Sequence, residues 1–117
     1  MSVHIFDLLR ENAVADNGLL IKNDSKGDTF NKPRDVDFAF KTTDKEKAES
    51  LSEFINGRNY GSSRVEHNVD DDLFWVFVVV HMPITQHVIC SMSGFMVCLS
   101  RLFQVEYDGW GSVIQSV

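Results

Sequence analysis

The segment Leu73–Met82 constrains the fold more than any other part of the chain, because it predicts a strand that is apolar on both faces. One face would carry Phe74, Val76, Val78 and Val80, and the other Trp75, Phe77 and Val79. Such a strand is typical of the inside of a sheet, with something packed on each side. The apolar run is far too short to span a membrane as a helix.

The residues that precede this strand predict one strand and one helix. Over residues 35–41, apolar Val36, Phe38 and Phe40 alternate with their neighbours, which is the period of a half-buried strand. The sequence Thr43-Asp44-Lys45-Glu46 then matches a capping box, with Thr43 as the N-cap. We expect the helix that follows to end at Gly57 in a left-handed conformation.

The remaining elements complete an alternating order of strands and helices. Residues 60–69 have the mixed polarity of an edge strand, and Asp70-Asp71-Asp72 indicates a turn that joins them to the apolar strand as an antiparallel hairpin. Apolar residues recur at helical spacing from Val88 to Phe103, with Thr85 as the N-cap. A last strand is predicted over residues 104–107, and the glycines that follow indicate a tight turn.

The order β-α-β-β-α-β predicts an α+β, ferredoxin-like sandwich, in which two helices cover one face of a four-stranded antiparallel sheet. We expect this domain at residues 35–117, preceded by a short helix at residues 1–18 that Ser2 caps and by a mobile linker at residues 19–34. The other face of the sheet would expose apolar residues of the strand at residues 73–82, near Trp75 or Phe74. The N-terminal helix or a partner chain is expected to cover them.

Charge and cysteine content narrow the class of partner and the compartment. With a net charge of −6 the chain is a poor direct ligand for nucleic acid, whereas a basic segment of another protein suits it. The charge is equally suited to maintaining solubility. Two Cys in one predicted helix form no disulfide framework, and the N-terminus has no pattern of a signal peptide, so we expect a cytoplasmic protein.

No recognisable catalytic or cofactor-binding constellation occurs in the sequence. His87 and Cys90 have the one spacing that could begin a metal site, but Cys90 is more simply a buried small apolar residue. The glycines near the end of the chain do not form a phosphate-binding loop. We therefore expect a protein that is not an enzyme and that uses no metal or cofactor.

Two acidic segments are the candidates for contact with a partner. The first is Asp70, Asp71 and Asp72, which form either a plain hairpin tip or a contact for basic side chains. The second comprises Glu106, Tyr107, Asp108 and Trp110. Aromatic rings beside carboxylates are what a binding site for an arginine-rich peptide needs. The same rings could instead pack over the sheet edge while the glycines permit a turn.

The string Gln104-Val105-Glu106-Tyr107-Asp108-Gly109-Trp110-Gly111, directly after an amphipathic helix, resembles the end of the regulator of ribonuclease E activity B family. Lys32-Pro33-Arg34-Asp35-Val36-Asp37-Phe38 is similar to that family's first strand. The resemblance covers residues 32–112. It implies a ferredoxin-like fold and an inhibitor that binds the scaffold region of ribonuclease E through protein–protein contact. It assigns no catalytic role to residues 106–111.

A second interpretation fits the same pattern. A ferredoxin-like domain can form a homodimer through its open sheet face and bind a small molecule in the cleft between the two copies. The strand at residues 73–82, apolar on both faces, supports this alternative.

Overall fold

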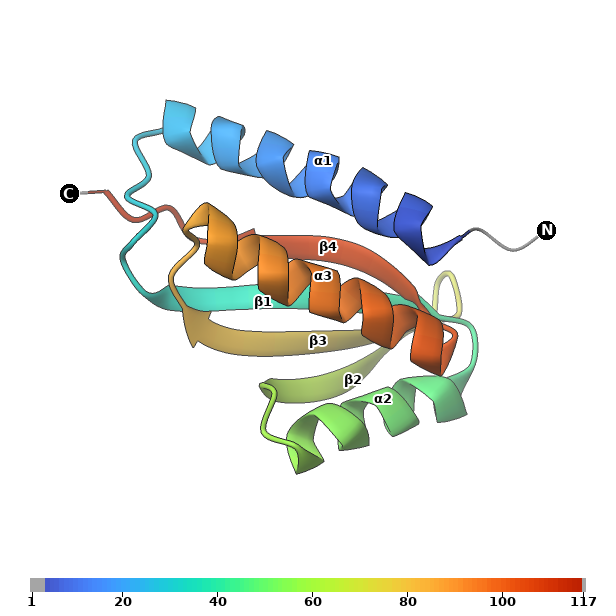
Figure 1. Ribbon diagram of the computed structural model, residues 1–117. Coiled ribbons are helices and arrows are strands. Elements are labelled where there is room, and N and C mark those ends of the chain that lie inside the picture. Colours follow the sequence, from blue (N-terminus) through green and yellow to red (C-terminus); the bar gives the residue numbers. More distant parts are fainter. Residues whose placement is uncertain (1–3, 117) are drawn as a thin grey trace.

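The computed structural model describes residues 4–116, and these form three helices and one four-stranded antiparallel sheet (Figure 1). In chain order the elements are α1 (Ile5–Ser25), β1 (Arg34–Thr42), α2 (Lys45–Gly57), β2 (Ser62–Asn68), β3 (Leu73–Met82), α3 (Gln86–Phe103) and β4 (Glu106–Ser112). After α1 this is the predicted β-α-β-β-α-β order, so the α+β, ferredoxin-like fold is confirmed.

The strands lie in the order β2-β3-β1-β4, and every neighbouring pair is antiparallel. The apolar strand β3 is therefore inside the sheet and the more polar β2 is at its edge, as predicted. Alternation along β1 and β3 sends one set of apolar side chains toward the helices. The members of that set without solvent exposure are Val36, Phe38, Phe40, Val76 and Val78.

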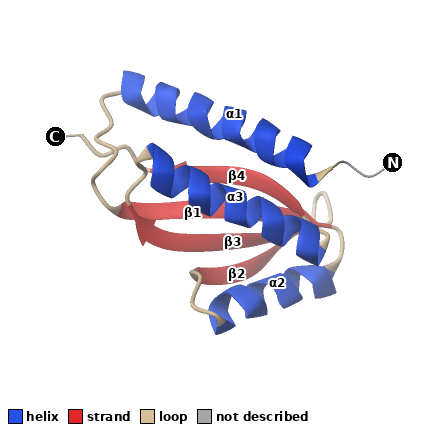
Figure 2. Cartoon of the chain, in the orientation of Figure 1, coloured by secondary structure: helices blue, strands red, loops and turns tan. Residues whose placement is uncertain are grey.

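All three helices lie on the same side of the sheet (Figure 2). Helices α2 and α3 close the core with Leu51, Ile55, Ile89, Met96 and Leu99, which are almost fully buried. Helix α1 packs along α3, above the β4 side of the sheet. The N-terminal helix therefore does not cover the second face, and no other described element does. This face is the open face of the sheet.

Helix α1 runs on to Ser25, beyond its predicted end at Gly18. The local turn signal at Asn17-Gly18 is overridden because residues on the next turns, Leu20 and Asn23, are buried in the fold. The N-cap is His4, whose Nδ1 accepts a hydrogen bond from the Phe6 N–H. The predicted cap Ser2 lies outside the described residues.

The segment between α1 and β1 is held by a buried ion pair. The Arg34 guanidinium lies 2.7 and 2.8 Å from the two carboxylate oxygens of Asp28, and both side chains are almost inaccessible to solvent. Arg34 also donates to the carbonyl oxygens of Thr29, Lys32 and Val113. The bond to Val113 joins this segment to residues near the end of the chain. The segment lies within the predicted linker, which thus makes specific contacts.

The ends of helix α2 differ from prediction by one or two residues. Its N-cap is Asp44, one residue after the predicted Thr43, and the Asp44 carboxylate accepts from the backbone N–H groups of Glu46 and Lys47. At the other end, the left-handed residue is Asn59 (φ 59°) rather than Gly57. Asparagine tolerates this conformation better than most residues.

Candidate functional site

The open face of the sheet carries a half-buried apolar row on β3. Trp75, Phe77 and Val79 alternate with the core residues of the strand. The Trp75 and Phe77 rings are nearly parallel, with centroids 5.8 Å apart and planes at 5°. A cation from each neighbouring strand lies over a ring: Lys41 Nζ is 5.6 Å from Trp75, and the Arg64 guanidinium is 4.9 Å from Phe77. This is cation–π geometry.

Carboxylates surround this aromatic row on the same face. Lys41 forms ion pairs with Asp108 (3.3 Å) and Glu106 (3.7 Å), and the contact with Asp108 contributes most to raising the pKa of Lys41. On the other side of the row, Arg64 pairs with Glu66 at 2.7 Å. The face therefore contains aromatic rings between two clusters of paired charges.

The acidic residues of the β2–β3 hairpin are exposed and organise its tip. The Asp71 carboxylate accepts from the Leu73 N–H, and the Asp70 N–H donates to the side chain of Asn68. Asp72, which has a positive φ of 54°, pairs with His67 at 2.8 Å. These bonds hold the turn, and all three carboxylates remain accessible to solvent.

Residues 108–111, which were predicted to form a turn after a strand at residues 104–107, continue that strand in the structure. β4 pairs with β1 along its length, with a shift in register between Ala39 and Phe40. Gly109 takes a φ of 102° at this bulge, where a side chain would be strained. Glu106 and Asp108 are exposed. Because of this bulge, Tyr107 and Trp110 both face the helix side although they are three residues apart, and Tyr107 is half-buried and Trp110 buried.

Tyr107 and Trp110 take part in an internal polar cluster that joins β4 to α1 and α3. The Trp110 Nε1–H and the Ser93 hydroxyl both donate to Asp16 Oδ1 at 3.0 Å. The Asn12 amide contacts Asp16 Oδ2 and Ser93 Oγ, and the Tyr107 hydroxyl lies 2.9 Å from Ser93 Oγ. Sequence reasoning did not identify Asp16, Asn12 or Ser93; the i, i+4 spacing of Asn12 and Asp16 in α1 is the one available signal.

Burial changes the acidity of several groups around this cluster. It raises the pKa of Asp16, although the hydrogen bonds from Ser93 and Trp110 act in the opposite direction. Burial also raises the pKa values of Tyr107 and of the Cys90 thiol. Both shifts favour the protonated, uncharged form of the group.

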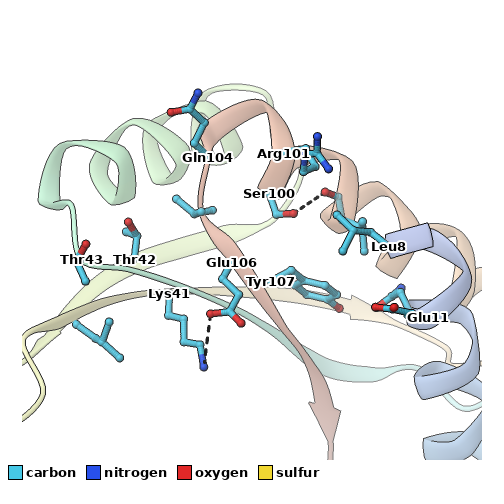
Figure 3. A pocket seen from close by; sticks show the side chains of 14 residues that line it. Leu8, Glu11, Lys41, Thr42, Thr43, Ser100, Arg101, Gln104, Glu106 and Tyr107 are labelled. Carbon is cyan, nitrogen blue, oxygen red and sulfur yellow. Dashed lines mark hydrogen bonds and ion pairs between the residues drawn. The ribbon is translucent and has the colours of Figure 1, made fainter. Parts of the chain in front are cut away.

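A cavity of about 810 Å³ opens where α1 begins, α3 ends and β4 starts (Figure 3). Tyr107, Leu8, Val97 and Val105 provide apolar walls. Around the rim stand two cationic and two anionic residues, namely Lys41, Arg101, Glu11 and Glu106. Opposite charges in similar number favour neither an anionic nor a cationic ligand.

Among residues 4–116, no group of three or more His, Cys, Asp or Glu side chains could hold a metal ion. Nor is any described helix long and apolar enough to cross a membrane.

The architecture and the surface define a ferredoxin-like domain with an open sheet face of aromatic and charged residues. The chain belongs to the family of regulators of ribonuclease activity B, abbreviated RraB, whose model matches residues 15–112. The family is one of regulators of ribonuclease activity, which implies a ribonuclease as a protein partner. No curated protein matches the sequence. The matched range begins one residue before Asp16 and includes both Tyr107 and Trp110.

Proposed function

We propose that the protein is a non-enzymatic, cytoplasmic regulator that binds the scaffold region of ribonuclease E and thereby alters which RNAs are degraded. The observation that carries this proposal is the match to the RraB family over residues 15–112. The net charge of −6 supports a partner segment that is basic. The exposed carboxylates Asp70, Asp71, Asp72, Glu106 and Asp108 are the proposed acidic contacts.

Tyr107 and Trp110 have a different part in this proposal. Both side chains hydrogen-bond inside the domain, so they hold β4 and α1 in place, and the outward carboxylates Glu106 and Asp108 meet the partner. Substituting Trp110 would perturb the fold together with any binding. The binding test therefore needs variants of exposed residues.

The test uses the purified protein and a purified scaffold fragment of ribonuclease E in calorimetric titration. We expect binding at low salt that weakens as the salt concentration rises, because exposed ion pairs are screened. Degradation of a structured RNA by full-length ribonuclease E should slow when the protein is added, and a ribonuclease without its scaffold region should be unaffected. Absence of binding at low salt would refute the proposal.

A further inference from the structure

The open sheet face contains a carboxylate without a counter-charge. Asp37 on β1 lies directly between Val79 on β3 and Gly111 on β4. Its side chain is exposed and forms no ion pair or hydrogen bond with any residue between 4 and 116. The other carboxylates on this face do have partners: Asp35 lies 3.0 Å from the His81 ring, Glu66 pairs with Arg64, and Glu106 and Asp108 pair with Lys41.

The sheet surface beside Asp37 has no long side chains standing on it, because three small residues form it. Ala39, Gly109 and Gly111 occupy neighbouring positions on β1 and β4, and a Cβ atom at either glycine would meet nothing within 4 Å. Phe77 stands next to Ala39 across the β1–β3 pair, and Trp75 next to Lys41. The result is a shelf of small residues with an aromatic wall on one side and Asp37 at its end.

We propose that this shelf binds arginine side chains of an extended segment of the partner protein. Asp37 is its anchoring carboxylate, and Phe77 and Trp75 form its wall. The inference rests on the proposed function, because it names the surface and the chemistry through which the regulator would hold its ribonuclease. A guanidinium can donate two parallel hydrogen bonds to one carboxylate and can lie flat on an aromatic ring. The shelf offers both partners side by side.

The net charge of the open face favours an arginine-containing segment over other ligands. The open face carries five carboxylates (Asp35, Asp37, Glu66, Glu106 and Asp108) against the two cations Lys41 and Arg64. Both cations already lie over the rings, which shows that these rings accept cations in this geometry. RNA bases could stack on exposed rings, but their phosphates would meet a surface of net negative charge.

The test measures the affinity of the whole protein for a synthetic peptide of alternating arginine and serine, by tryptophan fluorescence and by calorimetry. Asp37→Asn should weaken binding by about tenfold, the loss of one charge-assisted hydrogen-bonded contact. The same substitution at Asp24, an exposed carboxylate on α1, is the matched control and should leave the affinity unchanged. A peptide with lysine in place of arginine should bind more weakly to the wild type.

A second variant, Trp75→Leu, tests the aromatic wall, with Leu102→Ala on the exposed side of α3 as its control. Circular dichroism confirms that each variant is folded. Equal affinity of Asp37→Asn and Asp24→Asn for the arginine peptide would overturn the inference. So would tighter binding of a single-stranded RNA of the same length, or self-association that Trp75→Leu abolishes, since either would assign the face to another occupant.

The ribonuclease E scaffold fragment separates this inference from the proposed function. If the fragment binds the wild type and Asp37→Asn equally well, the function stands and the shelf is not its site. If the arginine peptide binds at the shelf while the fragment does not bind at all, the shelf chemistry stands and the ribonuclease E partner is wrong.

Discussion

Replacing Arg34 by Met should remove a large part of the stability of the domain. The Asp28 side chain is fully buried, and without the guanidinium it would keep only a long hydrogen bond of 3.3 Å from the Gln115 N–H. The carbonyl oxygens of Lys32 and Val113 would lose the hydrogen bond from Arg34, and the Thr29 carbonyl would keep only its bond from the Lys32 N–H, at 3.2 Å. Removal of one partner from a buried ion pair costs about 3–5 kcal/mol, because the remaining charge is buried without compensation.

Urea unfolding followed by circular dichroism measures this loss. With an m value of about 2 kcal/mol/M, a loss of about 4 kcal/mol lowers the midpoint by about 2 M. Domains of this kind have a total stability of about 5–15 kcal/mol, so the variant should still fold in buffer. A double variant, Asp28→Leu with Arg34→Met, should be less destabilised than the sum of the two single changes by up to about 3 kcal/mol.

Arg64→Met is the matched control, because Arg64 and Glu66 form a pair of the same length, 2.7 Å, with both side chains more than half exposed. Its loss should cost no more than about 1 kcal/mol. An Arg34→Met variant that is destabilised as little as Arg64→Met would refute the reasoning, because the buried pair would then contribute no more than an exposed one.

Three further predictions concern individual positions. Gly61→Ala should destabilise the domain by about 1–3 kcal/mol in urea unfolding, because the new Cβ would lie 2.7 Å from Val78 Cγ1. A Cβ at Gly18, inside α1, would meet nothing within 4 Å, so Gly18→Ala should stabilise the domain by about 0.5–1 kcal/mol. Asp44→Ala should cost about 1 kcal/mol and Thr43→Ala clearly less, and equal costs would contradict the observed cap. Burial raises the pKa of Asp16 above 3.8, so its favourable contribution is complete below that pH and is lost as the pH rises through the raised value. Unfolding measured over a pH series should therefore show the wild type losing stability relative to Asp16→Asn with rising pH, and a pH-independent difference would show that Asp16 titrates normally.

Much of the sheet could be predicted from the sequence because its strands carry their own periodicity. The alternation in β1 and the uninterrupted apolar run in β3 depend only on the residues themselves. The α1 extension and the continuation of β4 beyond Tyr107 could not be predicted in this way. Asn17-Gly18 and Asp108-Gly109 are local turn signals, and each is overridden by a partner elsewhere, α3 in the first case and β1 in the second.

The candidate site was predicted in part. The sequence separated the Trp75 row of β3 from the Phe74 row but left open which of the two faces outward, and the structure places Trp75 on the open face. The bulge at Gly109 decides which side chains of β4 face outward, and a bulge depends on the register between two strands. For the same reason the neighbours of Asp37 became known only with the pairing of β1 to β3 and β4.

The position of β1 at the centre of the sheet has a consequence for synthesis on the ribosome. β1 is made before either of its neighbours, β3 and β4, and β4 is the last of the described strands. Until β4 emerges, Phe38 and Phe40 lie on a strand with an open backbone edge, and Asp16 lacks its bond from Trp110. Such unpaired apolar strands are prone to aggregate. The sheet is therefore complete only after β4, the last described strand, has been synthesised and has paired with β1.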